Sequence, residues 1–211
     1  MTLIFAEPEI ESILQSYPLD SLHQSNDSVY ALRADLTLVY VNSGWSRFAS
    51  ENGGSAIPDR WPLGSSILDA IPAVLRPFFA DNFARCLNSN SPWQHLYECS
   101  SPQVFREFQM IAYPLGNRQG FLVVNSLFRS AMHSQSGRAP LEEDCRQENG
   151  MITQCAHCRR TKRLLEESTW DWVKSCPDRT SHGLCEPCFG YFYPENMPML
   201  HGFPEIFSTG Q

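Results

Sequence analysis

The chain has no run of about 18 apolar residues, the length that spans a lipid bilayer, among its 211 residues. Its first residues carry no basic segment ahead of an apolar run, and acidic residues follow at Glu7 and Glu9, so we expect no secretory leader. We therefore expect a cytoplasmic protein in a reducing compartment, with no membrane partner.

Positive charge is also scarce. The formal net charge is −7, with 16 Lys and Arg against 23 Asp and Glu, and neither half of the chain is basic. Binding to a phosphate backbone requires a basic surface, so the composition argues against a nucleic-acid partner. The basic run at residues 159–163 is the exception, and we interpret it as a solvated helix face that follows the first pair of cysteines.

Catalytic signatures are missing as well. No Ser/His/Asp or Cys/His arrangement can be assigned from spacing alone, and the sequence contains no internal repeat and no low-complexity tract. We therefore expect a protein that is not an enzyme.

Cysteine is plentiful, in contrast, with 8 residues in the chain. Two Cys-x-x-Cys hooks occur near the C-terminus, Cys155 with Cys158 and Cys185 with Cys188, and 26 residues separate them. Each hook places two thiolates on one tight turn, and two hooks complete the four-thiolate shell of a structural zinc site. A shell of four cysteines has no open position, so the zinc would stabilise structure and would not hydrolyse a substrate.

Other uses of these residues stay open. His182, three residues before Cys185, is an alternative ligand or a group that orients the metal ligands without binding the metal itself. Cys176 and His157 are also close enough in sequence to replace one of the four cysteines. The alternative function is a dithiol redox switch or an oxidoreductase that uses the Cys-x-x-Cys pairs.

The order of elements predicts an α+β fold. We divide the chain into an N-terminal helical segment (1–24), an α+β domain (25–130), a linker (131–150) that includes a short charged helix, and a cysteine-rich zinc-binding module with an aromatic tail (151–211). Apolar spacing predicts an amphipathic helix over 7–17 and further helices over 42–53, 67–71 and 74–87. Strand-preferring residues predict strands over 29–33, 36–41, 95–99, 105–113 and 120–128. Two strands, short helices and three strands suggest a five-stranded antiparallel sheet.

A cavity between this sheet and its helices would be natural. Trp45, Phe48, Phe79 and Phe83 are the candidates to line a ligand pocket, with a plain hydrophobic core as the alternative interpretation. Cys86 lies on an apolar helix face, where we expect it to pack in the core. For His95, beside Trp93 at a strand edge, we expect a surface or capping role rather than haem ligation.

Residues 25–130 resemble a PAS sensory domain. The resemblance is carried by residues 35–45 (Asp-Leu-Thr-Leu-Val-Tyr-Val-Asn-Ser-Gly-Trp), 63–69 (Leu-Gly-Ser-Ser-Ile-Leu-Asp) and 97–102 (Tyr-Glu-Cys-Ser-Ser-Pro). The resemblance implies a sheet with flanking short helices, and a cavity whose small-molecule ligand the sequence does not identify. It also implies a homodimer formed through the N-terminal helix.

The C-terminal part resembles a cysteine-rich module of bacterial two-component signalling proteins. Its motifs are Cys-Ala-His-Cys-Arg-Arg at 155–160, Trp-Asp-Trp-Val at 170–173 and Ser-His-Gly-Leu-Cys-Glu-Pro-Cys at 181–188. Since no kinase, cyclase or nucleotide-binding motif accompanies it, the resemblance implies a non-enzymatic sensor or adaptor. A small zinc-ribbon-like module would then contact a protein partner, a signalling component, and the aromatic residues after the second hook would supply an interface.

Overall fold

Two sheets organise the parts of the chain that the computed structural model describes. These parts are residues 13–14, 17–52, 54, 56–101, 103–132, 142–164, 169–173 and 179–196. The larger sheet has the strand order β2-β1-β5-β4-β3, and the smaller has the order β8-β7-β6-β9.

The first part of the described chain contains α2 (Leu19–Gln24), β1 (Ser28–Arg33), β2 (Leu38–Val41), α3 (Ser43–Glu51), α4 (Ile57–Arg60), η1 (Ile67–Ala70), η2 (Ala73–Leu75), α5 (Arg76–Ser89), β3 (Trp93–Glu98), β4 (Val104–Leu115), η3 (Gly116–Arg118) and β5 (Gly120–Met132). The second part contains η4 (Glu142–Cys145), β6 (Ile152–Cys155), β7 (Thr161–Lys162), β8 (Trp170–Asp171), β9 (Thr180–Gly183), α6 (Glu186–Phe192) and η5 (Pro194–Asn196).

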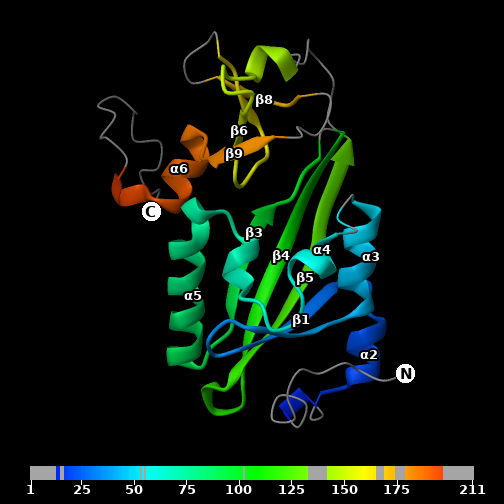
Figure 1. Cartoon of the computed structure of the whole chain (residues 1–211). Coiled ribbons are helices and arrows are strands. Elements are labelled where there is room, and N and C mark those ends of the chain that lie inside the picture. The colour runs from blue at the N-terminus through cyan, green and yellow to red at the C-terminus, as the bar shows by residue number, and fades with distance from the viewer. Residues whose placement is uncertain are drawn as a thin grey trace, which may run out of the picture.

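The larger sheet confirms the predicted α+β class. Every pair of neighbouring strands in it is antiparallel, and β4 and β5 form a long hairpin closed by η3. Figure 1 shows this hairpin running from the bottom of the larger sheet up to the part of the chain that contains β6 to β9, with α5 beside β3. The strands extend past the predicted limits, since β5 continues to Met132. We expected a helix over 7–17, most of which lies outside the described residues; the described helix α2 begins after Pro18.

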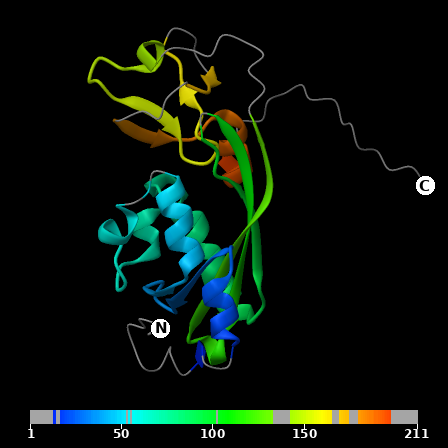
Figure 2. The ribbon, with the colours of Figure 1, turned by 90° about the vertical axis from the view of Figure 1, so that its right-hand side faces the viewer.

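Helices α3 to α5 cover one face of the larger sheet (Figure 2). Phe83 of α5 and Phe121 of β5 meet in the core between these layers, with ring centroids 5.0 Å apart. Full burial of a side chain of this size contributes about 1.5–3 kcal/mol. A second apolar cluster lies on the opposite face, where Leu14 packs against Val29 and Tyr40.

Asn42 fixes the start of α3, as its place in the sequence predicts. Its side-chain oxygen accepts hydrogen bonds from the backbone N–H groups of Val29 and Trp45, both at 2.9 Å. Its amide nitrogen donates to the carbonyls of Leu22 and Asp27, also at 2.9 Å. Asn42 therefore caps the helix and ties α2 and α3 to β1 of the larger sheet.

The smaller sheet carries the cysteine hooks. Its strands β6 and β9 pair in parallel, and its other pairs are antiparallel. We call β6 to β9 together with α6 the cysteine module. The interpretation of residues 159–163 as a helix face is wrong, because Thr161 and Lys162 form β7 and the Thr161 side chain is fully buried. No helix in the described ranges is long and apolar enough to cross a membrane.

The cysteine module lies against one end of the larger sheet and α5 (Figure 1). Leu75, at the start of α5, is buried in the same apolar cluster as Phe192 of α6. The Tyr193 hydroxyl donates to the carbonyl of Val74, and the backbone N–H of Glu98 in β3 donates to Nε2 of His157 at 3.3 Å. The two units therefore share a contact that is both apolar and hydrogen-bonded.

Candidate metal centre and adjoining cavity

The parallel pairing of β6 and β9 brings the two hooks together. Cys155 is the last residue of β6 and lies opposite Gly183. Two residues after Gly183, Cys185 precedes α6 as its N-cap, and Cys188 follows in the first turn of the helix. The backbone N–H of Ala156 donates to the carbonyl of Gly183 at 2.8 Å, which extends the ladder into the first hook.

The four cysteine sulfurs form a compact cluster. All four lie within 4.8 Å of one another and belong to buried residues. Cys158 Sγ and Cys185 Sγ are 3.6 Å apart, whereas a disulfide needs about 2.05 Å. Tetrahedral zinc with Zn–S bonds of about 2.3 Å separates its sulfurs by about 3.8 Å. The cluster therefore has the donor set and the spacing to bind a metal such as zinc.

Protons are shared unevenly among these thiols. Hydrogen bonds from Cys158, Cys185 and Cys188 hold the pKa of Cys155 well below its usual value. Hydrogen bonds among the same groups, led by Cys155, raise the pKa of Cys188 well above its usual value. A metal ion binds thiolates, so its binding would release the remaining protons and make affinity fall in acid.

His157 lies behind the sulfurs and joins them to the larger sheet. Its Nδ1 is 3.4 Å from Cys188 Sγ. Since Nε2 accepts from Glu98 N–H, Nδ1 carries the proton and donates to the sulfur. Burial lowers the pKa of His157, which favours this neutral form. His157 is therefore placed to support a ligand.

The other predicted ligands lie elsewhere. His182 is an exposed residue of β9 opposite Gln154 and does not belong to the cluster of sulfurs. Cys176 lies outside the described residues.

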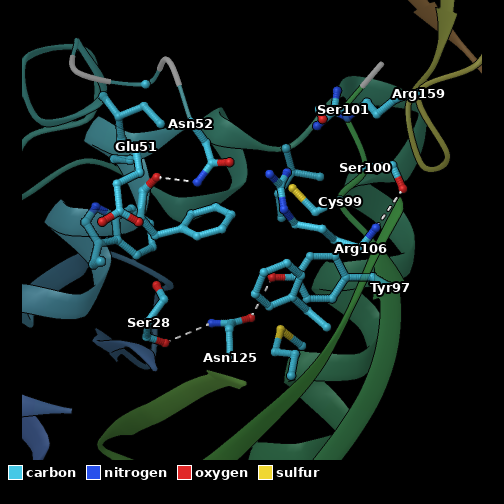
Figure 3. Close-up of a pocket in the computed structure, with 18 of the residues that line it drawn as sticks. Ser28, Glu51, Asn52, Tyr97, Cys99, Ser100, Ser101, Arg106, Asn125 and Arg159 are labelled. Carbon is cyan, nitrogen blue, oxygen red and sulfur yellow. Dashed lines mark hydrogen bonds between the residues drawn. The ribbon is translucent and has the colours of Figure 1, made fainter. Parts of the chain in front are cut away.

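A cavity of about 780 Å³ lies between the helices and the larger sheet, and Figure 3 shows residues of its wall. All four predicted residues, Trp45, Phe48, Phe79 and Phe83, line it. Phe48 and Phe108 meet edge to face, with ring centroids 5.3 Å apart. Most of the wall is therefore aromatic or aliphatic.

Asn125 supplies a polar group deep in the cavity. Its side-chain oxygen accepts from the Tyr97 hydroxyl at 3.0 Å, and its nitrogen donates to the Ser28 carbonyl at 3.3 Å (Figure 3). Burial raises the pKa of Tyr97 and of Tyr30, so both phenols stay neutral. This part of the wall offers hydrogen bonds without a net charge.

Two arginines on the cavity wall were missed by the sequence analysis. Figure 3 shows Arg106 and Arg159 on the same side as Cys99, opposite Glu51 and Asn52. Burial raises the pKa of the Cys99 thiol, and the positive charges of Arg159 and Arg106 oppose this rise. Alternation along β4 with the buried Phe108 could have placed Arg106 inside. No sequence signal links Arg159 to the cavity, because it comes from the cysteine module.

The expected surface or capping role of His95 is wrong. Its side chain is only 4% exposed. Its ring stacks between those of Trp93 and Tyr97, at 5.8 and 6.2 Å, and contacts Phe192 at 6.1 Å. Burial, with a smaller effect from His157, lowers the pKa of His95 to about 4. His95 is therefore a neutral part of the contact between the two units.

The predicted core position of Cys86 is confirmed. The residue is buried among the apolar side chains of the larger sheet and α5, and its Sγ donates to the carbonyl of Ala112 at 3.5 Å.

No family model and no curated protein matches the sequence. Solved structures do match the chain. The photoactive yellow protein domain of the sensor histidine kinase Ppr from Rhodospirillum centenum is 13% identical, with a TM-score of 0.39, and the match covers 54% of this chain and 95% of that one. The PAS domain of an HTR-like protein from Haloarcula marismortui is 24% identical, with a TM-score of 0.33, and the match covers 58% of this chain and 100% of that one.

The PAS domain of nitrogen regulation protein NR(II) from Vibrio parahaemolyticus is 11% identical, with a TM-score of 0.33, and the match covers 53% of this chain and 97% of that one. In this chain, the larger sheet has the strand order β2-β1-β5-β4-β3, with helices on one face. The chain has an α+β unit with a five-stranded antiparallel sheet, followed by a buried four-cysteine cluster.

Proposed function

We propose that the chain is a non-enzymatic sensor or adaptor in a signalling system. In this proposal, a small molecule in the PAS-like cavity changes how the cysteine module is held, and the module contacts a protein partner. A structural zinc ion held by Cys155, Cys158, Cys185 and Cys188 would keep the module folded.

The observation that carries the proposal is that the cavity and the module share wall residues. Ile71 and Phe79 line the cavity and also pack against the apolar cluster that contains the four cysteines and Phe192. An occupant that moves Phe79 must therefore disturb the packing of the module, because close-packed side chains transmit small displacements. The direct contact supplies a route for the signal that does not depend on the predicted linker.

The surface of the module supports a role in protein contact. Leu164 and Tyr191 are large side chains of the module that remain about half exposed, and tyrosine is enriched at protein interfaces. The buried cysteines are poorly placed to exchange disulfides with a substrate, which favours the structural role over the redox alternative.

Two matched substitutions test the proposal. Phe79→Leu alters a side chain of the shared wall, whereas Phe83→Leu alters a side chain that lines the cavity but packs in the core of the PAS-like unit. In the zinc-loaded protein, we expect Phe79→Leu to speed hydrogen exchange in α6 and zinc release to a chelator. Phe83→Leu should leave both rates close to those of the wild type. Equal effects of the two substitutions on α6 would contradict the proposal.

A further inference from the structure

Two arginines from different units line the same cavity. Arg106 belongs to β4 of the larger sheet, and Arg159 follows the first hook of the cysteine module. We propose that the cavity binds a small aromatic carboxylate, whose anionic group lies between Arg106 and Arg159. The inference rests on the proposed function and deepens it by naming the class of ligand.

The wall of the cavity indicates the body of the ligand. Its volume of about 780 Å³ is within the usual range for small-molecule sites, roughly 300–1,000 Å³. Trp45, Phe48 and Phe108 present aromatic rings to it, and such rings favour edge-to-face or offset contacts with another ring. An aromatic body therefore matches the greater part of the cavity wall.

The charges at the wall indicate the head group. Among the described residues, neither Arg106 nor Arg159 forms an ion pair. Of the acidic residues nearby, Glu107 pairs with Arg129 at 2.9 Å, and Glu98 accepts a hydrogen bond from the Ser100 hydroxyl at 2.7 Å. The carboxylate across the cavity, Glu51, belongs to an exposed residue that water can solvate. The hydrogen bond from Ser100 leaves Glu98 charged, and its charge acts on Cys99 against those of the two arginines. Two half-buried guanidinium groups against one carboxylate still leave this part of the wall positive beside an apolar space, and a ligand carboxylate matches it.

The backbone of Arg159 is set by the hook itself. Its φ angle is +65°, in the left-handed region, within the turn that the Cys155 N–H closes by donating to the Arg160 carbonyl at 2.7 Å. This turn places Arg159 directly after Cys158, where its side chain lines the cavity.

The position of the anion would couple the two units. Arg159 follows Cys158 directly, so a carboxylate that pairs with Arg159 and Arg106 joins the metal hook to β4. By linkage, the factor by which the bound ligand favours contact between the units equals the factor by which that contact favours ligand binding.

A pair of probes of nearly equal shape separates charge from apolar binding. 1-Naphthaleneacetate carries the carboxylate, and 1-naphthaleneacetamide replaces it with a neutral amide. We would titrate each by calorimetry into the full-length, zinc-loaded protein. We expect the acid to bind at least about tenfold more tightly, because charge-assisted hydrogen bonds exceed neutral ones by about this factor. We also expect added salt to weaken binding of the acid alone.

Substitutions then assign the effect to the two arginines. Arg106→Gln and Arg159→Gln should each weaken binding of the acid about tenfold and leave binding of the amide unchanged. The matched control is Arg129→Gln, which removes an exposed arginine of β5 outside the cavity wall and should change neither affinity.

The outcomes separate this inference from the proposed function. The inference is wrong if both probes bind with equal affinity, if neither probe binds, or if neither substitution changes the affinity of the acid. Equal binding accompanied by slower hydrogen exchange in α6 would leave the sensor proposal standing. Selective, arginine-dependent binding of the acid without any change in α6 would support the inference and contradict the sensor proposal.

Discussion

Truncation of Phe192 should separate the cysteine module from the larger sheet without releasing the metal. Phe192 is 6% exposed, and its ring meets those of Phe78 and His157 edge to face, with centroids 4.8 and 5.1 Å apart. A buried Phe→Ala change costs about 3–5 kcal/mol. We expect the lower end, because Phe192 lies at a seam where water can replace the ring.

A loss of about 3 kcal/mol changes the equilibrium between docked and undocked module by roughly 100-fold. The assay is hydrogen exchange of the zinc-loaded protein, read at Glu98, whose N–H lies on the edge strand β3 and donates to His157 of the module. In Phe192→Ala, exchange at Glu98 and in α6 should rise by about that factor, while zinc content stays at one ion per chain. Zinc remains because the substitution leaves all four cysteines in place.

Leu164→Ala is the control. Leu164 belongs to the same module, between β7 and β8, and its side chain is 49% exposed, so its removal should change exchange at Glu98 much less. The reasoning is refuted if Phe192→Ala leaves exchange at Glu98 unchanged, or if Leu164→Ala raises it to the same degree.

Three further substitutions test the metal centre, the helix cap and the buried imidazole. Cys158→Ser should abolish stoichiometric zinc in native mass spectra and unfold the module while the unit of the larger sheet keeps its own melting transition, because metal binding supplies the folding energy of such modules. One zinc per chain in this variant would contradict the four-cysteine shell. Asn42→Ala should lower the free energy of unfolding, measured by urea denaturation, by about 2–4 kcal/mol, because it removes a helix cap and leaves the buried N–H of Val29 unpaired. A loss below about 1 kcal/mol would count against that role. The pKa of His95 is about 4 in the folded protein and 6.5 in the unfolded chain. The free energy of unfolding is therefore unaffected by this group above pH 6.5 and falls, by up to about 3 kcal/mol, as the pH is lowered towards 4. His95→Phe should reduce the fall in stability over this interval, and equal pH profiles for variant and wild type would show that His95 is not the titrating group.

The sequence predicts the elements of this protein better than their contacts. Strands β1 to β5 could be predicted because runs rich in strand-preferring residues lie between turn signals. Asn42 marks the start of α3 as an N-cap does. The hooks around Cys155 and Cys185 could be predicted as a group because a tetrahedral metal site requires just such pairs. These features depend on local spacing.

His95 and Arg159 could not be placed in this way. The position of His95 at a strand edge indicates a surface or capping role, but Phe192, which is 97 positions later in the chain, is among the residues that cover it. The basic run at residues 159–163 was interpreted as one exposed face, yet a turn and the short strand β7 give its members different surroundings. Both errors concern the seam between the two units, which forms only by tertiary packing.

The parallel ladder between β6 and β9 has a consequence for tolerance to insertion. The ladder sets the register of Cys155 against Gly183. Strand pairing, and not the length of the 26-residue segment between the hooks, therefore brings the two hooks together. Doubling such a loop costs only about 0.6 kcal/mol in closure entropy. The segment between the hooks also contains β7, β8 and β9, so foreign sequence could be grafted there only between these strands, where the small sheet would hold both ends of the insertion.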